Sequence, residues 1–331
     1  MVTHHSEFPK ILLIGAGQLG SRYLQGLSQS EESLQITVVD PNARALLIAK
    51  ERFEEMPKNP IKQYVQYHDN YKKVKNIFDL IIVSTNADVR TQIVKYLLRN
   101  FFFKYMILEK VAFQAIKDFQ EIIELLKKKN VKAWINCPRR TYPFFKKLKK
   151  EISKEKLIRM VVKGSDWGLA SNTIHMLDLL AFLSDQDEFI FDISELDENI
   201  YKSKRASFIE LGGKLRCKSI RGDSLELLDN KKTNDPFNYI IEFGDKRIEI
   251  NQDAEIATVF SKNGLKSIES RFSMPMQSEI TTNLVKQILN NADSSLTTIQ
   301  ESFLLHRCMI EGFNNHLSKV LKKSIVVCPI T

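Results

Sequence analysis

Apolar runs of strand length alternate with helix-patterned segments over the first 136 residues. A strand-like run at residues 10–14 is followed by a helical segment and by a second strand-like run at residues 36–39. Residues 115–128 carry apolar side chains at the spacing of one buried helix face. This alternation predicts an α/β fold with a doubly wound parallel sheet. The other elements expected here are strands at residues 63–67, 78–83, 105–108 and 131–135, the last closing the sheet, and helices at residues 42–55 and 88–99.

The pattern changes near residue 136, so we expect a first domain at residues 1–136 and a second at residues 137–331. Between residues 189 and 256, strand-like segments are separated by turn signals such as Gly222-Asp223 and Gly244-Asp245. Strands at that spacing favour an antiparallel sheet. The other elements expected here are helices at residues 142–152, 171–183, 277–290 and 298–321, a strand at residues 157–163, and a last strand at residues 325–328 that ends this domain or returns toward the first.

Length and composition agree with a two-domain globular protein. The chain has 331 residues, of which 43% are hydrophobic and 27% are charged. No run approaches 18 consecutive apolar residues, and the first nine residues lack the order of a signal peptide. Four scattered cysteines fit a reducing compartment and argue against a disulfide framework or a zinc site. We therefore expect a cytoplasmic protein with no membrane span and no bound metal.

The net charge of +9 raises the question of a nucleic-acid partner. The lysines gather at residues 127–129 and along residues 146–156, and no recognisable nucleic-acid motif accompanies them. A solvated basic helix face is the favoured interpretation, and it would still attract anionic substrates. We expect neither nucleic acid nor a membrane as a partner.

A glycine-rich turn follows the first strand-like run, and Asp40 ends the second. The turn reads Gly15-Ala16-Gly17-Gln18-Leu19-Gly20. A G-x-G-x-x-G sequence between a strand and a helix, with an acid about 20 residues later, is typical of a dinucleotide site. Gly15 would permit a tight turn, Gly17 a close approach of the pyrophosphate, and Gly20 close packing of helix on sheet. An ordinary strand–turn–helix is the less favoured alternative.

Residues around this turn bear on the cofactor. Gln18 and Leu19 would present the N-terminus of the following helix to the phosphates. Asp40 would accept hydrogen bonds from the adenosine ribose and repel a 2′-phosphate, which favours NAD(H). Arg44, one helical turn further on, weakens that preference, so NADP(H) stays open as the alternative.

Polar residues also follow two later strands of the expected sheet. Ligands bind outside the carboxyl ends of such strands, so Ser84-Thr85-Asn86 is a candidate contact to the ribose or nicotinamide. A polar helix cap is an equally favoured reading. Glu109-Lys110 lies at the next strand end, where Lys110 could donate a hydrogen bond to a substrate oxygen. Taken alone, Lys110 would more often be a solvated lysine.

One helix of the second half carries a candidate proton carrier. His175 and Asp178 lie three residues apart beside an apolar face. Histidine is the usual side chain for moving a proton near neutral pH. A core or helix-surface histidine is the more common case for such a residue taken alone.

Together these features resemble the glucose-fructose oxidoreductase, inositol dehydrogenase and rhizopine-catabolism family (Gfo/Idh/MocA). The resemblance rests on the glycine-rich turn, Glu109-Lys110, residues 136–143, the helix with His175 and the terminal Pro329-Ile330-Thr331, and it covers essentially the whole chain. It implies a Rossmann domain followed by an α+β domain whose large antiparallel sheet often mediates oligomerisation, here into a homodimer or tetramer. It also implies oxidation or reduction of a sugar or cyclitol carbon with NAD or NADP.

The resemblance assigns roles residue by residue. The family's Glu-Lys-Pro motif falls on Glu109-Lys110-Val111, which implies that Glu109 borders the cofactor and that Lys110 orients the substrate. The helix histidine falls on His175, which implies a proton donor or acceptor. The residues implied to contact the substrate are Arg139, Tyr142, Trp167, Asn172 and Asp178.

Two positions depart from the family pattern. Val111 stands in place of the proline after Lys110, which removes a constraint on this loop. Ser171 stands where an aspartate usually precedes the histidine by four residues, so carboxylate assistance would come from Asp178 or Asp166, or be absent. Either change would fit an unusual substrate or lost catalysis.

The leading hypothesis is an NAD(H)-dependent oxidoreductase that acts on a sugar or sugar derivative. The sequence resembles divergent members of bacterial surface-polysaccharide pathways, whose helix reads Asn-Ser/Thr-x-His. An activated or acidic sugar such as a nonulosonate would suit the positive charge. One alternative is a reductase of another small molecule on the same fold, as in biliverdin reductase or a homoserine-type dehydrogenase. The other is a non-catalytic nucleotide-sensing protein that keeps the Rossmann site.

Overall fold

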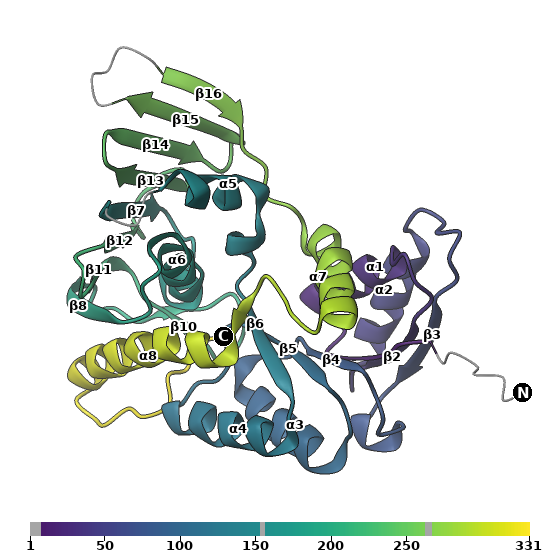
Figure 1. Cartoon of the computed structure of the whole chain (residues 1–331). Coiled ribbons are helices and arrows are strands. Elements are labelled where there is room, and N and C mark those ends of the chain that lie inside the picture. The colour runs from purple at the N-terminus through teal and green to yellow at the C-terminus, as the bar shows by residue number, and fades with distance from the viewer. Residues whose placement is uncertain (1–7, 153–155, 262–266) are drawn as a thin grey trace, which may run out of the picture. The chain divides into compact units, whose positions relative to one another are not determined.

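The computed structural model describes residues 8–152, 156–261 and 267–331 (Figure 1). The chain forms two compact units. The first unit holds the described residues of Met1–Ala112, Gln120–Asn136 and Pro275–Ile299, and the second holds those of Phe113–Phe119, Cys137–Met274 and Gln300–Thr331. Each unit is therefore discontinuous in sequence, whereas the sequence suggested one consecutive domain on each side of residue 136.

The first unit is built on a seven-stranded sheet with the order β17-β6-β5-β4-β1-β2-β3. The strands β1 to β6 run parallel, as their alternation with helices predicted. β17 pairs antiparallel with β6, so the expectation that β6 closes the sheet was wrong; a strand of two residues leaves no pattern to detect. The strands are β1 (Lys10–Ile14), β2 (Gln35–Val39), β3 (Tyr64–His68), β4 (Leu80–Val83), β5 (Tyr105–Glu109), β6 (Lys132–Asn136) and β17 (Thr297–Thr298).

Helices cover both faces of this sheet, with α1, α2 and α7 on one side and α3 and α4 on the other (Figure 1). α7 packs against α1 although it comes from near the other end of the chain. A Cβ at Gly26 would lie 2.4 Å from the carbonyl oxygen of Ser278, so this glycine allows the two helices to approach closely. The helices are α1 (Gln18–Ser28), α2 (Ala43–Glu54), α3 (Ala87–Asn100), α4 (Ile116–Lys129) and α7 (Gln277–Asn291).

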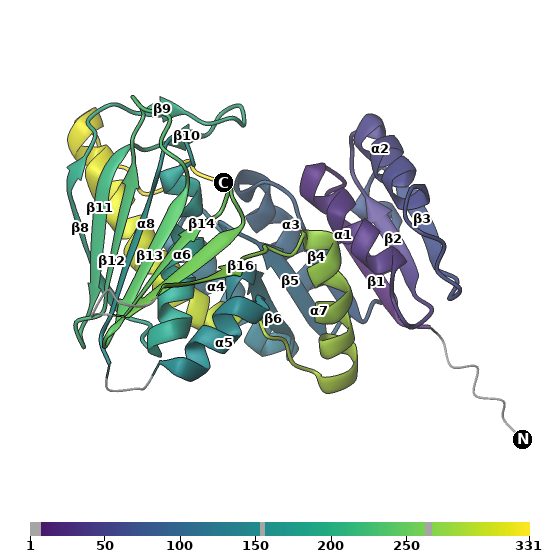
Figure 2. The same cartoon turned by 90° about the horizontal axis from the view of Figure 1, so that it is seen from above.

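The second unit contains an eight-stranded sheet with the order β16-β15-β14-β13-β7-β12-β11-β8 (Figure 2). All neighbours pair antiparallel except β7 and β12, which are parallel. The expected large and mostly antiparallel sheet is thereby confirmed. Its strands are β7 (Ile158–Gly164), β8 (Phe189–Leu196), β11 (Gly213–Ser219), β12 (Ser224–Asp229), β13 (Asn238–Phe243), β14 (Lys246–Asn251), β15 (Ile256–Ser261) and β16 (Ser267–Arg271), beside a small pair of β9 (Tyr201–Lys202) and β10 (Ile209–Glu210).

One face of this sheet is buried under helices. Along β12 and β13 buried residues alternate with partly exposed ones, which is the pattern of a sheet covered on one side. The Phe145 ring of α5 lies 6.4 Å from the Tyr239 ring of β13, and a Cβ at Gly312 of α8 would lie 3.4 Å from Phe191 of β8. The helices are α5 (Pro143–Glu151), α6 (Leu169–Ser184) and α8 (Ile299–Leu321), with a short 3₁₀ turn at Pro138–Thr141.

The expectation of a last strand at residues 325–328 was wrong, because these residues form no strand. The Cys328 N–H donates to the carbonyl oxygen of Gln114 at 2.9 Å, and the Pro329 carbonyl accepts from Ile209 N–H at 3.0 Å. Cys328 and Ile330 are fully buried. Val326 and Val327 are exposed, so only the last part of this apolar segment is buried, and single hydrogen bonds hold it in place.

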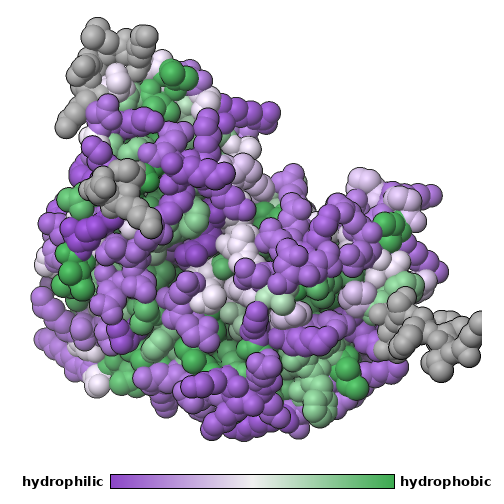
Figure 3. All heavy atoms as spheres, in the orientation of Figure 1, coloured by the Kyte–Doolittle hydropathy of each residue, from purple (hydrophilic) through white to green (hydrophobic). Residues whose placement is uncertain are grey.

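The face of the molecule in Figure 3 is largely hydrophilic, with apolar residues in small groups. Lys127, Lys128 and Lys129 lie exposed at the C-terminal end of α4, where positive charge opposes the negative end of the helix dipole. Lys154, which belongs to the second basic segment, lies outside the described residues. Within the described ranges no helix combines the length and the apolar character that crossing a bilayer requires.

Candidate functional site

Gly15 and Gly20 hold the turn between β1 and α1 against the end of β4. Gly15 has a φ of +95°, and a Cβ there would lie 2.9 Å from Ser84 Oγ. A Cβ at Gly20 would lie 1.9 Å from the carbonyl oxygen of Gly15. The packing of the protein itself therefore requires both glycines.

Gly17 differs from these two glycines because the space beside it is open. Its two chain neighbours aside, a Cβ built there meets no atom of the described residues within 4 Å. Gly17 is the N-cap residue of α1, whose first turn holds no acidic residue and whose N-terminus no described side chain caps. The N–H groups at exposed Gln18 and half-buried Leu19 can therefore receive an anion. This cradle fits the pyrophosphate of a dinucleotide.

Asp40 lies beside the same turn, directly after β2. Its Oδ2 accepts a hydrogen bond from Ala16 N–H at 2.7 Å, and its Oδ1 accepts one from Asn42 N–H at 2.8 Å. Each carboxylate oxygen has further acceptor capacity. Asp40 thus braces the glycine-rich turn and can also accept from a ribose hydroxyl. Arg44 follows in the first turn of α2.

Ser84, Thr85 and Asn86 differ in what they contact. Ser84 Oγ lies 2.7 Å from the carbonyl oxygen of Gly15, to which its hydroxyl donates. Thr85 Oγ1 is buried and has no hydrogen-bond partner among the described residues. Asn86 occupies the N-cap position of α3, but its exposed side chain makes no capping hydrogen bond. Ser84 therefore stabilises the turn, and the exposed side chain of Asn86 presents polar groups that a ligand can use, whereas the Thr85 hydroxyl is buried.

Glu109, the last residue of β5, is buried within a hydrogen-bonded cluster. Its Oε1 accepts from Tyr23 O–H and from Asn136 Nδ2, both at 2.6 Å. Asn136 Nδ2 also donates to Gln277 Oε1 at 2.8 Å, and Asn136 Oδ1 has no partner within the described part of the chain. Burial, reinforced by the charge of Glu109, raises the pKa of Tyr23 well above its ordinary value, so Tyr23 stays a proton donor. Glu109 therefore ties three segments of the first unit together.

Lys110 follows directly and is half-buried. Its peptide bond to Val111 is cis. Beside it lies Arg90, which the sequence analysis did not single out and whose guanidinium donates to carbonyl oxygens on both sides of Lys110. A signal did exist, because Arg90 shares the core-facing spacing of Ile93, Val94 and Leu97 on α3, where a charged residue is unusual.

In the second unit, α6 carries His175 and Asp178. His175 is half-buried. Asp178 is fully buried, and its two oxygens accept hydrogen bonds from Arg140 Nε and Nη2 at 2.9 and 2.8 Å. This bidentate pair departs from the expected substrate contact, because no part of Asp178 is exposed to a ligand.

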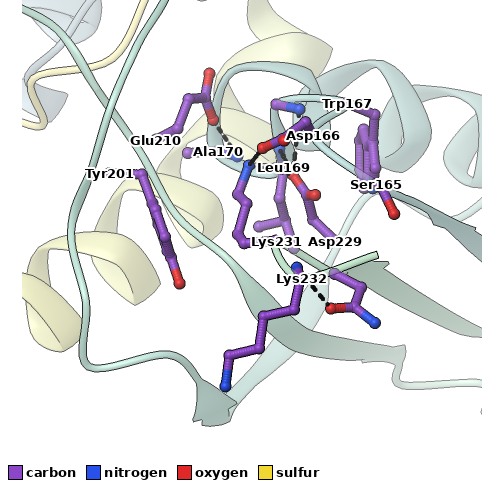
Figure 4. Close-up of polar contacts among 12 residues, drawn as sticks. Ser165, Asp166, Trp167, Leu169, Ala170, Tyr201, Glu210, Asp229, Lys231 and Lys232 are labelled. Atoms are coloured by element: carbon purple, nitrogen blue, oxygen red, sulfur yellow. Dashed lines mark hydrogen bonds and ion pairs between the residues drawn. The ribbon is translucent and has the colours of Figure 1, made fainter. Parts of the chain in front are cut away.

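Two carboxylates from neighbouring segments hold the first turn of α6 (Figure 4). Asp229 Oδ2 accepts from Leu169 N–H at 3.1 Å, and Glu210 Oε2 accepts from Ala170 N–H at 2.9 Å and from Ser171 N–H at 3.3 Å. Carboxylates stabilise helix N-termini because they satisfy free N–H groups and oppose the positive end of the dipole. Ser171 itself has no carboxylate, and the one that lies beside it belongs to Glu210 of β10.

Lys231 offsets the negative charge of this cluster. Its Nζ lies 2.9 Å from Asp229 and 3.1 Å from Asp166 (Figure 4). Burial acts to lower the pKa of Lys231, but the hydrogen bonds and negative charges of Asp229 and Asp166 together outweigh it, and the pKa is raised. Asp166, which the sequence offered as a helper for His175, is exposed and is engaged by Lys231 instead.

Arg139 and Tyr142 make contacts inside the second unit. Arg139 Nε donates to Tyr239 O–H at 3.0 Å. Tyr142 is buried, and its ring stacks on Phe145 at 6.3 Å between centroids. Burial raises the pKa of Tyr142. Tyr142 is therefore a core residue, while half-buried Arg139 keeps part of its side chain accessible.

Trp167 and Asn172 belong to the same local arrangement at the start of α6. Trp167 Nε1 donates to the Leu228 carbonyl at 2.9 Å, and Asn172 Nδ2 donates to the Trp167 carbonyl at 2.6 Å. Both residues are half-buried.

Across the described ranges, no three His, Cys, Asp or Glu side chains are grouped as metal ligands would be.

Comparison with known proteins bears most directly on the first unit. Residues 9–137 match a family model, GFO_IDH_MocA, described as an oxidoreductase family with an NAD-binding Rossmann fold. The match spans β1 to β6 and so includes both the glycine-rich turn and the Lys110 loop. No curated protein sequence matches the chain.

Solved structures match nearly the whole chain. One neighbour is described as a putative NADPH-dependent oxidoreductase from Desulfitobacterium hafniense, with a TM-score of 0.71, 12% identity, and 96% of this chain and 97% of that chain covered. UDP-N-acetylglucosamine 3-dehydrogenase from Acidithiobacillus ferrooxidans has a TM-score of 0.67, 10% identity and coverages of 92% and 97%. The transcriptional regulator Gal80p from Kluyveromyces lactis has a TM-score of 0.67, 14% identity and 96% coverage of both chains. At these identities the likeness shows the fold.

Proposed function

We propose that this chain, whose residues 9–137 match the model of the Gfo/Idh/MocA oxidoreductase family with an NAD-binding Rossmann fold, oxidises or reduces a carbon of a sugar or sugar derivative. The observation that carries the proposal is the uncapped N-terminus of α1 at Gly17, where a Cβ would meet only open space. A helix start of this kind binds phosphate through main-chain N–H groups and the helix dipole.

The cofactor proposed is NAD(H). Gly17, Gln18 and Leu19 would bind its pyrophosphate, and Asp40 would accept from its adenosine ribose. Thr85 and Asn86, at the end of β4, would contact the ribose or nicotinamide. NADP(H) is the alternative, which Arg44 supports and which suits the structural neighbour described as NADPH-dependent.

Two residues are proposed to act on the substrate. The bound nicotinamide supplies the hydride acceptor or donor. Lys110 donates a hydrogen bond to the reacting oxygen, and its positive charge stabilises negative charge that develops there. His175 takes the hydroxyl proton during oxidation and returns it during reduction, a role that suits an imidazole near neutral pH.

The substrate class proposed is an activated or acidic sugar, as in surface-polysaccharide biosynthesis. The net charge of +9 supports an anionic substrate, because a basic protein attracts anions. One structural neighbour is described as acting on UDP-N-acetylglucosamine, which is such a sugar.

We also propose a homodimer or tetramer formed through the eight-stranded sheet. Its outward side carries charges of both signs, such as Arg159 and Glu242 at 2.7 Å, and the exposed apolar residue Ile190. A face with both charges and apolar surface can pair with a copy of itself. Molecular mass in solution, measured by light scattering for the wild type and Ile190→Asp, tests this.

The function is tested by turnover of a panel of nucleotide sugars and acidic sugars with NAD(H) and NADP(H). The wild type should turn over at least one of them, and Lys110→Ala and His175→Ala should each lower kcat by roughly 10²-fold or more while NADH still binds. Lys104→Ala is a matched control, since this lysine lies exposed just before β5. Wild-type turnover by both variants would rule out the assigned mechanism.

A non-catalytic nucleotide sensor is the second candidate. It is favoured by the neighbour described as a transcriptional regulator and by the departures at Val111 and Ser171. A sensor would bind NAD(H) as tightly as the enzyme but would show no hydride transfer with any sugar of the panel.

A further inference from the structure

Arg90 is a cation buried in the interior of the first unit. It lies in α3, and only 1% of its surface is exposed. Its neighbours along the same helix face, Ile93 and Val94, are buried apolar residues. Burying a guanidinium is costly unless its N–H groups find acceptors. The hydrogen-bond acceptors that surround its guanidinium therefore indicate the role of this arginine.

The guanidinium is bound by main-chain carbonyl oxygens from two loops. Nη1 donates to Glu109 at 2.6 Å, to Ala112 at 3.0 Å, and to Val111. Nη2 donates to Thr85. The first three acceptors belong to the loop that follows β5, and the fourth to the loop that follows β4. One rigid, planar group thus joins the ends of two adjacent parallel strands.

These contacts enclose Lys110 in the chain. The residues immediately before and after it both offer their carbonyl oxygens to the same nitrogen of Arg90. The main chain of Lys110 is therefore held on both sides. Val111, which lacks the fixed φ of a proline, cannot supply such a restraint itself.

We propose that Arg90 is a positioning residue that fixes the Lys110 loop against the Thr85 loop and so sets where the Lys110 ammonium lies. The claim about the substrate rests on the function proposed above, in which Lys110 contacts the reacting oxygen. The claim about the loop rests on the hydrogen bonds alone. Arg90 itself touches neither substrate nor cofactor in this scheme.

Hydrogen–deuterium exchange tests the loop without any substrate. In Arg90→Lys, amides of residues 110–113 should exchange about tenfold faster or more, since hydrogen bonds to a charged donor are lost, while amides of β1 and β2 keep their rates. Arg90→Gln, which keeps an amide donor and removes the charge, is a second variant in case the lysine does not fold. Arg99→Lys is the matched control, because Arg99 is exposed on the same helix.

A double variant tests whether the restraint is what matters. Arg90→Lys/Val111→Pro should recover part of the slow exchange, because proline fixes φ at residue 111. Unchanged exchange at residues 110–113 in the single variants, or an equal rise throughout the first unit, would overturn the proposal in favour of a general packing role. An absence of recovery in the double variant would also count against it.

Kinetics extend the test to function. With a substrate in hand, Arg90→Lys should lower kcat about tenfold or more while the Kd for NADH changes less than about threefold, because the α1 phosphate cradle is untouched. A larger loss of NADH binding than of kcat would overturn the assignment. If exchange changes locally but the wild type turns over no sugar, the positioning of the loop stands and the proposed oxidoreductase function fails.

Discussion

Asp178 and Arg140 form a buried bidentate ion pair in the second unit, with N···O distances of 2.8 and 2.9 Å. Arg140 lies in the 3₁₀ turn before α5, and Asp178 lies in the middle of α6. Within the second unit, the pair therefore joins the 3₁₀ turn before α5 to the helix that carries His175.

Removing one partner of this pair should destabilise the protein strongly. We expect Asp178→Ala to lower the free energy of unfolding by about 3–5 kcal/mol, because it leaves the Arg140 charge uncompensated in the interior. Asp185→Asn is the control: it removes a mostly exposed carboxylate that lies 2.5 Å from Lys149, keeps a residue type that tolerates the positive φ of 55° there, and should cost less than about 1 kcal/mol. Urea denaturation of both variants decides, and equal losses would contradict the importance of the buried pair.

Gly17 and Gly20 should respond in opposite ways to alanine. Gly17→Ala should keep the stability of the wild type but weaken NADH binding about tenfold or more, because the methyl group enters the phosphate cradle. Gly20→Ala should cost about 3 kcal/mol or more of stability, because its Cβ would overlap the Gly15 carbonyl. Thermal melts and NADH fluorescence titrations separate the two effects. Tight NADH binding by a folded Gly17→Ala protein would refute the cradle.

Asp40 should set the preference between the two cofactors. Asp40→Asn keeps an oxygen that can accept from Ala16 N–H but removes the charge that would repel a 2′-phosphate. The ratio of the NADPH to the NADH dissociation constant should fall about tenfold. Arg44→Ala should move the same ratio the other way, and a ratio that neither variant changes would place the adenosine ribose elsewhere.

Alkaline pH should destabilise the protein through a buried thiol. Burial, followed by the charge of Glu210, raises the pKa of Cys328 from 9.0 to about 12. The protonated thiol therefore stabilises the folded state fully below pH 9.0, and this contribution is lost as the pH rises from 9.0 toward about 12. In that window Cys328→Ala should show a decline in unfolding free energy that is shallower by about 1.4 kcal/mol per pH unit. Denaturant titrations at pH 8, 9 and 10 measure the difference, and parallel slopes would contradict it.

The fold followed from local pattern to a large extent. The helix expected at residues 115–128 is α4 at Ile116–Lys129, and the strand expected at residues 105–108 is β5 at Tyr105–Glu109. Where the local pattern gave a wrong or incomplete prediction, contacts between distant parts of the chain determined the structure. Residues 325–328 are as apolar as a strand, yet Val326 and Val327 are exposed, and of these four residues only Cys328 is buried, where its N–H donates to the Gln114 carbonyl. The assignment of α7 to the first unit depends on Gly26, whose role is visible only once both helices are placed.

The candidate site divides in the same way. Glycines at residues 15, 17 and 20 predict a phosphate-binding turn, because the backbone geometry that each glycine permits is set by a few neighbouring residues of the chain. The sequence could not predict two other contacts. Arg90 lies 20 positions before Lys110 and binds the Lys110 loop only in the folded protein. Arg140 lies 38 positions before Asp178 and pairs with it only after folding. A buried charged side chain needs hydrogen-bond partners, and only the folded interior determines which groups lie close enough to serve.

By itself, then, the sequence determined the α/β alternation, the dinucleotide turn and the positions of Lys110 and His175 at the ends and faces of regular elements. Periodicity and spacing encode such features because hydrogen-bonding repeats and backbone geometry are local. Only the tertiary structure decided that Asp178 binds Arg140, that Glu109 is enclosed by Tyr23 and Asn136, and that Arg90 clamps the Lys110 loop. These choices minimise unpaired polar groups in the interior, a condition that the whole fold must satisfy at once.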